Sequence, residues 1–164
     1  MPVDIRRASD LDWPALWPIW QSIAAAQETY MFDPFTPAEQ AQRSWLPDPP
    51  AETWLATDPN AGVLGTYVLK PNNPGPGSHV ANAGFMVAPA ARRQGVGRRL
   101  AEHCLARARE VGYLAMQFNA VVATNTGALA LWAALGFDRV GTVPHAYRHR
   151  TQGLVDIHIL HRTL

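Results

Sequence analysis

The stretch Arg92-Arg93-Gln94-Gly95-Val96-Gly97 combines positive charge with two glycines, after a predicted strand and at the start of a long amphipathic helix. A phosphate group needs several convergent N–H donors and a positive potential, and the first turn of a helix offers both. The glycines keep side chains away from an approaching anion, and Arg98 adds charge nearby. This segment therefore predicts a diphosphate site. It is not a P-loop, because no Gly-Lys-Ser/Thr ending follows, and Leu100 stands where a dinucleotide fingerprint has its third glycine.

Taken alone, Gly-x-Gly after a strand is equally consistent with glycines that only permit a tight strand-to-helix turn. A second motif favours the functional interpretation. Residues 87–97 resemble the acetyl-CoA signature of the Gcn5-related N-acetyltransferase superfamily, whose core is Arg/Gln-x-x-Gly-x-Gly/Ala, and residues 125–137 resemble its second signature, Asn-x-x-Ala…Gly-Phe. The resemblance implies an acetyl-CoA-dependent N-acetyltransferase. Arg93 is a departure, since many members have glycine there.

The same resemblance implies where the co-substrate acetyl-CoA binds. The strands that hold residues 79–87 and 114–122 are expected to splay apart and form a slot for the thioester. The first strand should pair with the pantetheine arm through its backbone at Phe85, Met86 and Val87, and Asn125 should face the arm. The pyrophosphate should be held by the segment of Arg92, Arg93, Gln94, Gly95, Val96, Gly97 and Arg98.

Acetyl transfer to an amine needs a neutral nucleophile, a polarised carbonyl and a proton for the leaving thiolate. A free amine with a pKa of about 10 is mostly protonated at neutral pH, so a base or a water chain helps. Many relatives carry a carboxylate on the strand before the pyrophosphate loop, but residues 78–87 contain no Asp or Glu. The candidates that remain are His79, a water held by Asn82 or Asn119, and Glu28, which shares with Tyr30 the loop where the family binds its acceptor.

The proton donor is also open. The family's usual acid is a tyrosine four residues before the Gly-Phe pair, and this sequence has Trp132 there, which lacks a phenol. Tyr147 or water can serve instead, or the thiol leaves without a dedicated acid. Asn119 is expected to be buried in mid-strand, where asparagine is disfavoured, so it is either a ligand or oxyanion group or part of a structural network.

Other polar and aromatic clusters are expected to be structural. Cys104 has the helical spacing of a core residue, and the three tryptophans at 13, 17 and 20 are expected to form a packing face. No metal site is expected, because four histidines lack cysteine neighbours: His145, His149, His158 and His161.

The elements that must position these residues follow the order β-α-α-β-β-β-α-β-α-β-β, an α/β arrangement with a mixed sheet. Pro18 is expected to kink or shorten the first helix, and Thr36, with Glu39 three residues on, is expected to cap the second. Strands are predicted at residues 3–7, 53–57, 62–69, 79–87, 114–122, 137–143 and 154–161, and later helices at 95–111 and 125–135. The resemblance implies one N-acetyltransferase domain over residues 1–164, with about seven mostly antiparallel strands and helices on both faces.

The bulk composition excludes some partners. Fourteen basic and thirteen acidic residues leave a formal charge of +1, so the chain has no general field for nucleic acid or a membrane surface. Cys104 is the single cysteine and cannot form an internal disulfide, which favours a reducing compartment. The N-terminus lacks the apolar core of a signal peptide, and no apolar run approaches the roughly 20 residues that span a bilayer. A cytoplasmic protein is predicted.

The acceptor is expected to be a small molecule with an α-amino group that attacks directly in a ternary complex. Phe118-Asn119 and the strands that follow resemble the branch of phosphinothricin and azetidine-carboxylate acetyltransferases, and a substrate carboxylate could meet Asn119 or Arg148. Protein amines and aminoglycosides stay open as acceptors. Two rival functions are a catalytically silent acyl-CoA-binding regulatory module and a nucleotide-binding α/β protein. A homodimer through the terminal strands or the first helix is plausible.

Overall fold

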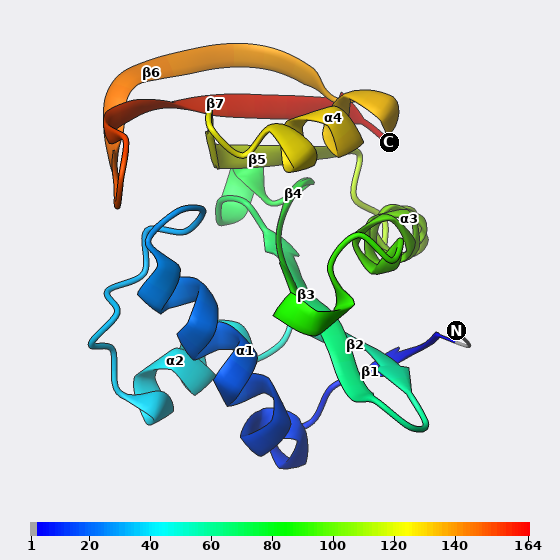
Figure 1. The fold of residues 1–164 in the computed structure, drawn as a ribbon. Coiled ribbons are helices and arrows are strands. Elements are labelled where there is room, and N and C mark those ends of the chain that lie inside the picture. Colours follow the sequence, from blue (N-terminus) through cyan, green and yellow to red (C-terminus); the bar gives the residue numbers. More distant parts are fainter. Residues whose placement is uncertain (1–2) are drawn as a thin grey trace.

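A seven-stranded sheet in the order β1-β2-β3-β4-β5-β7-β6 runs through residues 3–164, the part of the chain that the computed structural model describes (Figure 1). Neighbouring strands are antiparallel except β4 and β5, which are parallel. The strands are β1 (Asp4–Arg7), β2 (Glu52–Asp58), β3 (Gly62–Pro71), β4 (Val80–Val87), β5 (Ala115–Val122), β6 (Asp138–His149) and β7 (Gly153–Thr163). The helices are α1 (Trp13–Ala26), α2 (Ala38–Trp45), α3 (Val96–Glu110) and α4 (Thr126–Ala134).

This order of elements confirms the predicted α/β arrangement. Met1 and Pro2, part of the N-terminal stretch that lacks a signal-peptide pattern, lie outside the described residues. Within residues 3–164, no helix has the length and apolar character needed to cross a membrane.

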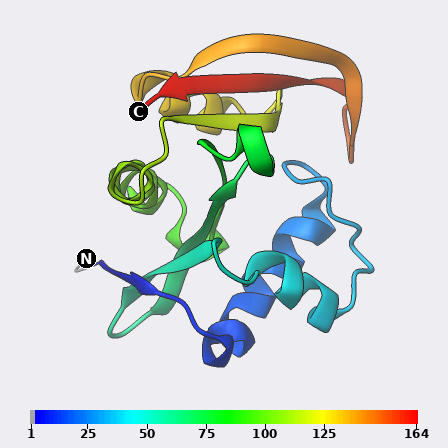
Figure 2. The same cartoon turned by 180° about the vertical axis from the view of Figure 1, so that it is seen from behind.

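The helices cover both faces of the sheet, with α1 and α2 on one side and α3 and α4 on the other (Figures 1 and 2). Strand β3 shows how the sequence achieves this, because successive side chains of a strand point to opposite faces. Tyr67 and Leu69 belong to the core under α3, while Val68 belongs to the core under α1. The predicted tryptophan packing face lies in the second core, where Trp13 and Trp20 are buried.

Two details of the early helices differ from the prediction. Helix α1 continues through Pro18 to Ala26, so of the two effects predicted for Pro18, a kink or a shortened helix, the shortening does not occur. Thr36 does not cap α2, because its hydroxyl donates to the carbonyl of Asp33, and the helix starts after Pro37. Local competition for a hydroxyl group of this kind is common in turns.

Strands β6 and β7 form a hairpin that is longer than predicted. Register shifts near Gly141 and between Val143 and Tyr147 interrupt the pairing. Such bulges break the alternation of apolar and polar residues on which the prediction depended, so the sequence pattern stopped at Val143 while the strand continues to His149.

The sheet opens between β4 and β5, as predicted. Only the first residues of the two strands pair, Val80 with Ala115 and Ala81 with Met116. The side-chain amide of Asn82 then donates to the carbonyl of Gln117 at 2.9 Å. Asn82 therefore closes the base of a fork whose two arms separate beyond it.

Candidate functional site

A cavity of about 780 Å³ occupies the opening between β4 and β5. Its walls come from the segment that follows α1, from β4 and β5, from the turn before α3 and from α4. Among the predicted site residues, ten line this cavity: Glu28, Asn82, Phe85, Met86, Val87, Arg92, Arg93, Gly97, Asn119 and Asn125. The fold therefore gathers residues from the two family motifs and the early loop around one space.

The start of α3 forms one end of the cavity, which we call the phosphate end and define as residues 92–98. No side chain of the described residues caps the first turn of α3, so its main-chain N–H groups keep their capacity for a ligand. The amide of Gln94 turns back and donates to the carbonyl of Ala90 at 2.8 Å. Val96 is buried, and Arg98 pairs with Glu102 at 3.5 Å, so these two contribute backbone and charge rather than cavity wall.

The glycines of this end match the demands of an anion cradle. Gly95 has a φ of +79°, a conformation that L side chains rarely adopt. A Cβ at Gly97 would meet only Val87 Cγ2, at 3.7 Å, and the rest of that space is open. Arg93 also has a positive φ, +60°, which explains why glycine suits this position in the family pattern.

Asn125 fixes the start of α4 at the opposite wall. Its side-chain oxygen accepts a hydrogen bond from the main-chain N–H of Ala128 at 3.3 Å, which makes it the N-cap of the helix. The same residue lines the cavity. Asn125 thus caps the helix from a position on the cavity wall.

The free edge of β4 carries the polar groups expected to meet that arm. Alternate residues of a strand direct their N–H and C=O to opposite sides. Phe85 and Val87 present theirs to the opening, while Met86 faces β3 and its side chain is buried. This alternation gives the main-chain groups of Phe85 and Val87, rather than those of Met86, access to an arm bound in the opening.

At Phe85 a tyrosine already occupies the edge. The Tyr30 hydroxyl accepts from the Phe85 N–H at 2.6 Å and donates to the Phe85 carbonyl at 2.8 Å. The Tyr30 ring stacks on Phe32 with centroids 4.7 Å apart and meets Trp45 edge-on. A Cβ at Gly84 would lie 3.1 Å from this hydroxyl, so a glycine in mid-strand makes the approach available. Burial raises the pKa of Tyr30, so the hydroxyl stays protonated at neutral pH.

The tip of the β6–β7 hairpin holds this loop from the other side of the fork, as both ribbon views show (Figures 1 and 2). The Tyr147 hydroxyl donates to the Tyr30 carbonyl at 3.0 Å, and the Arg150 N–H donates to the Gln27 carbonyl at 3.2 Å. Burial and the nearby Glu28 carboxylate raise the pKa of Tyr147. Tyr147 does not line the cavity, so the structure makes it a support of the loop.

We call the other end of the cavity the acceptor end and define it by residues 28–32 with Asn82 and Asn119. Glu28 is the only carboxylate among the described residues that line the cavity. Asn119 is exposed, contrary to the expectation of burial, because β5 bulges after Phe118. Its amide donates to Asn72 at 2.7 Å and its oxygen accepts from Gln117 at 2.9 Å.

His79 lies apart from these groups. It is exposed, its ring nitrogen Nδ1 lies 3.1 Å from the Pro76 carbonyl oxygen, and it does not line the cavity. The loop before β4 carries it to the closed end of the fork, so its placement gives no support to a role as the base. Asn82 lines the cavity, but its amide nitrogen donates to the Gln117 carbonyl. Its main role in this structure is therefore to connect β4 to β5 at the base of the fork.

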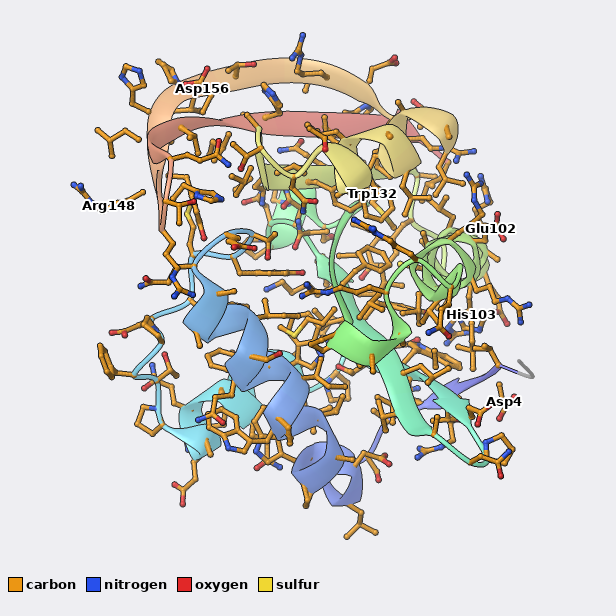
Figure 3. All side chains as sticks on the ribbon, in the orientation of Figure 1. Asp4, Glu102, His103, Trp132, Arg148 and Asp156 are labelled. Atoms are coloured by element: carbon orange, nitrogen blue, oxygen red, sulfur yellow. The ribbon has the colours of Figure 1, made fainter. Side chains whose placement is uncertain are left out.

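Aromatic side chains form the wall beneath the slot. Trp132 extends from α4 into the interior (Figure 3), where its ring lies 4.9 Å from that of Phe85 and 4.6 Å from that of Phe118. It is buried and lines the cavity, which confirms the expectation that it packs at the core and the wall. Cys104 is fully buried, and burial raises the pKa of its thiol, which confirms a structural residue.

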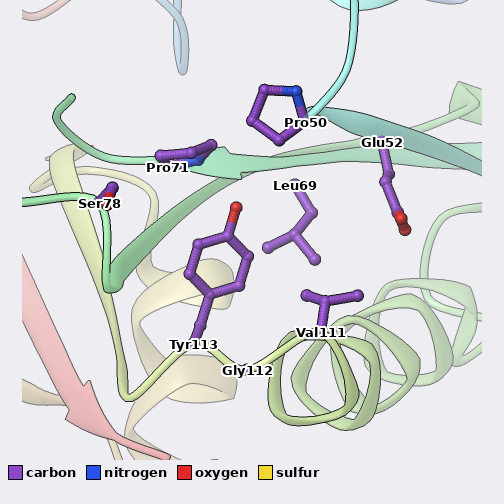
Figure 4. A pocket seen from close by; sticks show the side chains of 8 residues that line it. All are labelled: Pro50, Glu52, Leu69, Pro71, Ser78, Val111, Gly112 and Tyr113. Atoms are coloured by element: carbon purple, nitrogen blue, oxygen red, sulfur yellow. The ribbon is translucent and has the colours of Figure 1, made fainter. Parts of the chain in front are cut away.

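A smaller hollow of about 290 Å³ lies away from the fork, between β3 and the end of α3 (Figure 4). Glu52 lines it, but Arg107 holds this carboxylate with two hydrogen bonds of 2.8 Å and keeps its pKa low. In residues 3–164 no three His, Cys, Asp or Glu side chains gather as a metal site would require. The large cavity is therefore the candidate site.

The model of the acetyltransferase (GNAT) family matches residues 15–137, three quarters of the chain and all of the cavity's walls from α1 to α4. The chain belongs to this family. A GCN5-related N-acetyltransferase from Kribbella flavida is 48% identical, with a TM-score of 0.95 over 99% of this chain and 98% of its own.

Two further proteins are less similar. The N-acetyltransferase aca1 of Schizosaccharomyces pombe is 41% identical over 103 residues, which are 62% of this chain and 49% of aca1, so the chain spans about half the length of that relative. The protein yncA of Salmonella typhimurium, solved with its cofactor acetyl-CoA, is 19% identical, with a TM-score of 0.83 over 100% of this chain and 95% of its own. The second likeness is one of fold alone.

The GNAT motifs identified the phosphate end, but sequence reasoning placed too little weight on the acceptor end. The resemblance places Glu28 and Tyr30 together on the acceptor loop but gives no partner for the Tyr30 hydroxyl, and it does not single out Met31 and Phe32, which also line the cavity. One indication was available, because Gly84 interrupts a strand, and such a glycine often marks the close approach of another group. Nothing in the sequence showed that this group is Tyr30.

Proposed function

We propose that this chain is an N-acetyltransferase that moves the acetyl group of acetyl-CoA to the primary amine of a small molecule. The observation that carries the proposal is the phosphate end: an uncapped helix start with Gly97 open to the cavity and two arginines on its rim. When bound, acetyl-CoA supplies the acetyl group, whose carbon gains a bond to the amine nitrogen and loses its bond to sulfur, and the proton lost by the amine balances the leaving thiolate.

The residues present fit this co-substrate. The space beside Gly97 is open apart from Val87, so a diphosphate can approach the backbone there, and the N–H groups of the first turn of α3 carry the positive end of the helix dipole. Arg92 and Arg93 add charge, and the free edge of β4 at Phe85 and Val87 offers main-chain partners to the pantetheine amides. Asn125 lines the same channel.

The acceptor end suits an amine better than an acid. Among the described lining residues the cations, Arg92 and Arg93, lie at the phosphate end, while Glu28 gives the acceptor end its charge. Arg148 does not help a substrate carboxylate, because it lies on the outer side of the hairpin and points away from the body (Figure 3). The carboxylate of an amino acid would then depend on the amides of Asn82 and Asn119.

In the proposed reaction Glu28 attracts the incoming ammonium group and takes up its proton, directly or through water. Asn119 lies in a row of paired amides with Asn72 and Gln117, which can hold that water. His79 stays a formal candidate for the base, although the structure sets it outside the cavity. A cavity that holds both ends open at once supports direct attack in a ternary complex.

The experiment is a screen of amino acids, amino-acid analogues and polyamines with acetyl-CoA, read out by thiol release. Acetylation of at least one small amine, lost in Gly97→Glu, supports the proposal. CoA binding without turnover on any amine would favour a silent acyl-CoA-binding module instead. Displacement of CoA by ATP or NAD would favour a nucleotide-binding protein.

A cytoplasmic location and a homodimer belong to the same proposal. The dimer is tested by light scattering at two protein concentrations, where a mass twice that of the chain supports it and a mass of 18.0 kDa contradicts it.

A further inference from the structure

Tyr30 is the polar group at the fork whose role the family motifs do not explain. Its hydroxyl meets both polar main-chain groups of Phe85 at the free edge of β4, inside the cavity. Those main-chain groups belong to the stretch expected to meet the pantetheine arm and the acetyl group. The hydroxyl therefore lies at the place where the reacting carbonyl has to be held.

Resting on the function proposed above, we infer that the Tyr30 hydroxyl is a catalytic hydrogen-bond donor to the carbonyl oxygen of the bound acetyl group. In this role the hydroxyl relays the Phe85 N–H: it accepts a hydrogen bond from that group and donates its own to the acetyl carbonyl oxygen. The hydroxyl oxygen accepts from that N–H at 2.6 Å, and its own proton, which rotates about the C–O bond, can move from the Phe85 carbonyl to a ligand oxygen. The Phe85 carbonyl is then released for a pantetheine N–H.

The chemistry favours an oxygen as the partner of this donor. Negative charge grows on the carbonyl oxygen as the amine nitrogen bonds to the acetyl carbon, and donors fixed in advance at that point lower the barrier. A hydroxyl that already accepts from an N–H is polarised and donates more strongly. Tyr30 keeps its proton at all times in this role, because it stabilises charge and transfers no proton.

The surroundings hold the hydroxyl in place before any ligand binds. The ring is stacked between neighbours, with Phe32 at 4.7 Å and Trp45 edge-on at 6.1 Å. The Tyr30 carbonyl is fixed by Tyr147 across the fork. The missing side chain at Gly84 leaves the hydroxyl its approach to β4. Three separate segments thus position one oxygen atom.

Trp132 stands where the family usually has a tyrosine, and Tyr30 brings a phenol to the slot from another element. Trp132 and Tyr30 reach Phe85 from opposite faces of β4, the first by ring contact at 4.9 Å and the second by main-chain hydrogen bonds. Among the described residues that line the cavity, Tyr30 is then the one that carries a phenol. This hydroxyl serves the carbonyl, so the leaving thiolate takes its proton from the amine or from water.

The test is the infrared carbonyl stretch of acetyl-CoA labelled with carbon-13 at the carbonyl, bound to the wild-type protein and to Tyr30→Phe. Tyr113→Phe is the matched control, because Tyr113 lines the smaller hollow and not the cavity. We expect a shift to lower frequency in the wild type and in Tyr113→Phe, and loss of most of that shift in Tyr30→Phe. Calorimetry should give CoA dissociation constants within about threefold for all three proteins, and kcat should fall about 10- to 100-fold in Tyr30→Phe.

Each other result counts against the inference. An unshifted stretch in the wild type, or an equal shift in Tyr30→Phe, overturns it. If Tyr30→Phe folds but no longer binds CoA, the hydroxyl is structural and the inference is wrong. Failure of the wild type to bind acetyl-CoA at all sinks the proposed function itself, which the calorimetry separates from the other outcomes.

Discussion

The phosphate end of the cavity is built from one continuous stretch of chain, whereas the acceptor end is assembled from three segments that are distant in sequence. Residues 92–98 supply glycine, arginine and helix start within seven positions. Residues 28–32 come from the loop after α1, Asn82 from β4 and Asn119 from β5, and Tyr30 of this loop is held by hydrogen bonds to Phe85 and from Tyr147. A local motif thus forms the end expected to bind the diphosphate, whereas tertiary packing forms the end expected to bind the amine.

The largest effect is expected from Gly97→Glu. The new carboxylate would enter the open space at the first turn of α3 and repel the diphosphate, weakening CoA binding about 100-fold or more by calorimetry. An acidic residue in a first helical turn favours the helix, so the fold should persist. Gly97→Ala is the control, because its Cβ meets only Val87 at 3.7 Å and affinity should stay within a few fold. Equal CoA affinity in the two variants would contradict the phosphate end.

Glu28→Gln tests the other end. Removing the one lining carboxylate of the described cavity should raise KM for the amine about tenfold and leave CoA affinity unchanged, because Arg92 and Arg93 lie at the far end. Glu39→Gln, on α2 outside the lining, is the matched control. If amine KM does not move, or CoA affinity falls with it, the two ends are not the separate sites described above.

Tyr147→Phe probes the support of the acceptor end. The hydrogen bond to the Tyr30 carbonyl would be lost, which should lower the free energy of unfolding by about 1 kcal/mol in urea titration. Activity should fall a few fold, less than in Tyr30→Phe, because Tyr147 acts only through the loop. A loss of activity larger than that of Tyr30→Phe would assign the direct role to Tyr147.

Asn82→Ala opens the base of the fork. Loss of the hydrogen bond to the Gln117 carbonyl should destabilise the protein by about 1 kcal/mol and weaken CoA and amine binding to a similar, small extent. Binding of both ligands should weaken, because the Asn82–Gln117 hydrogen bond holds together the two strands that form both ends of the cavity. A selective effect on the amine, with stability unchanged, would instead place Asn82 in the chemistry.

The smallest effect is expected from the pair Arg93→Gly and Arg93→Ala. Both remove the same charge from the rim of the phosphate end, so both should weaken CoA binding by about threefold. Only glycine relieves the left-handed backbone at φ +60°, so the free energy of unfolding from urea titration should be about 1 kcal/mol higher for Arg93→Gly than for Arg93→Ala. Equal stabilities would remove the backbone explanation for glycine at this position in the family.

The order of elements, the phosphate end and the splay of β4 from β5 could be predicted, because each depends on local pattern or on a motif. The acceptor end could be predicted only in part: Glu28, Tyr30, Asn82 and Asn119 line the cavity, but their contacts did not follow from the sequence. Asn119 was expected to be buried, yet a bulge after Phe118 turns it outward, and His79 stands at the wrong end of the fork. Tyr30 reaches Phe85 across 55 positions of sequence, a contact that no local pattern encodes.

The most direct test is a crystal structure of the protein with CoA. We predict diphosphate oxygens within hydrogen-bond distance of main-chain N–H groups in residues 92–98, with Gly97 facing the linker and no side chain between them. A diphosphate bound elsewhere, or N–H groups of this turn occupied by the protein's own side chains, would contradict the account at its centre.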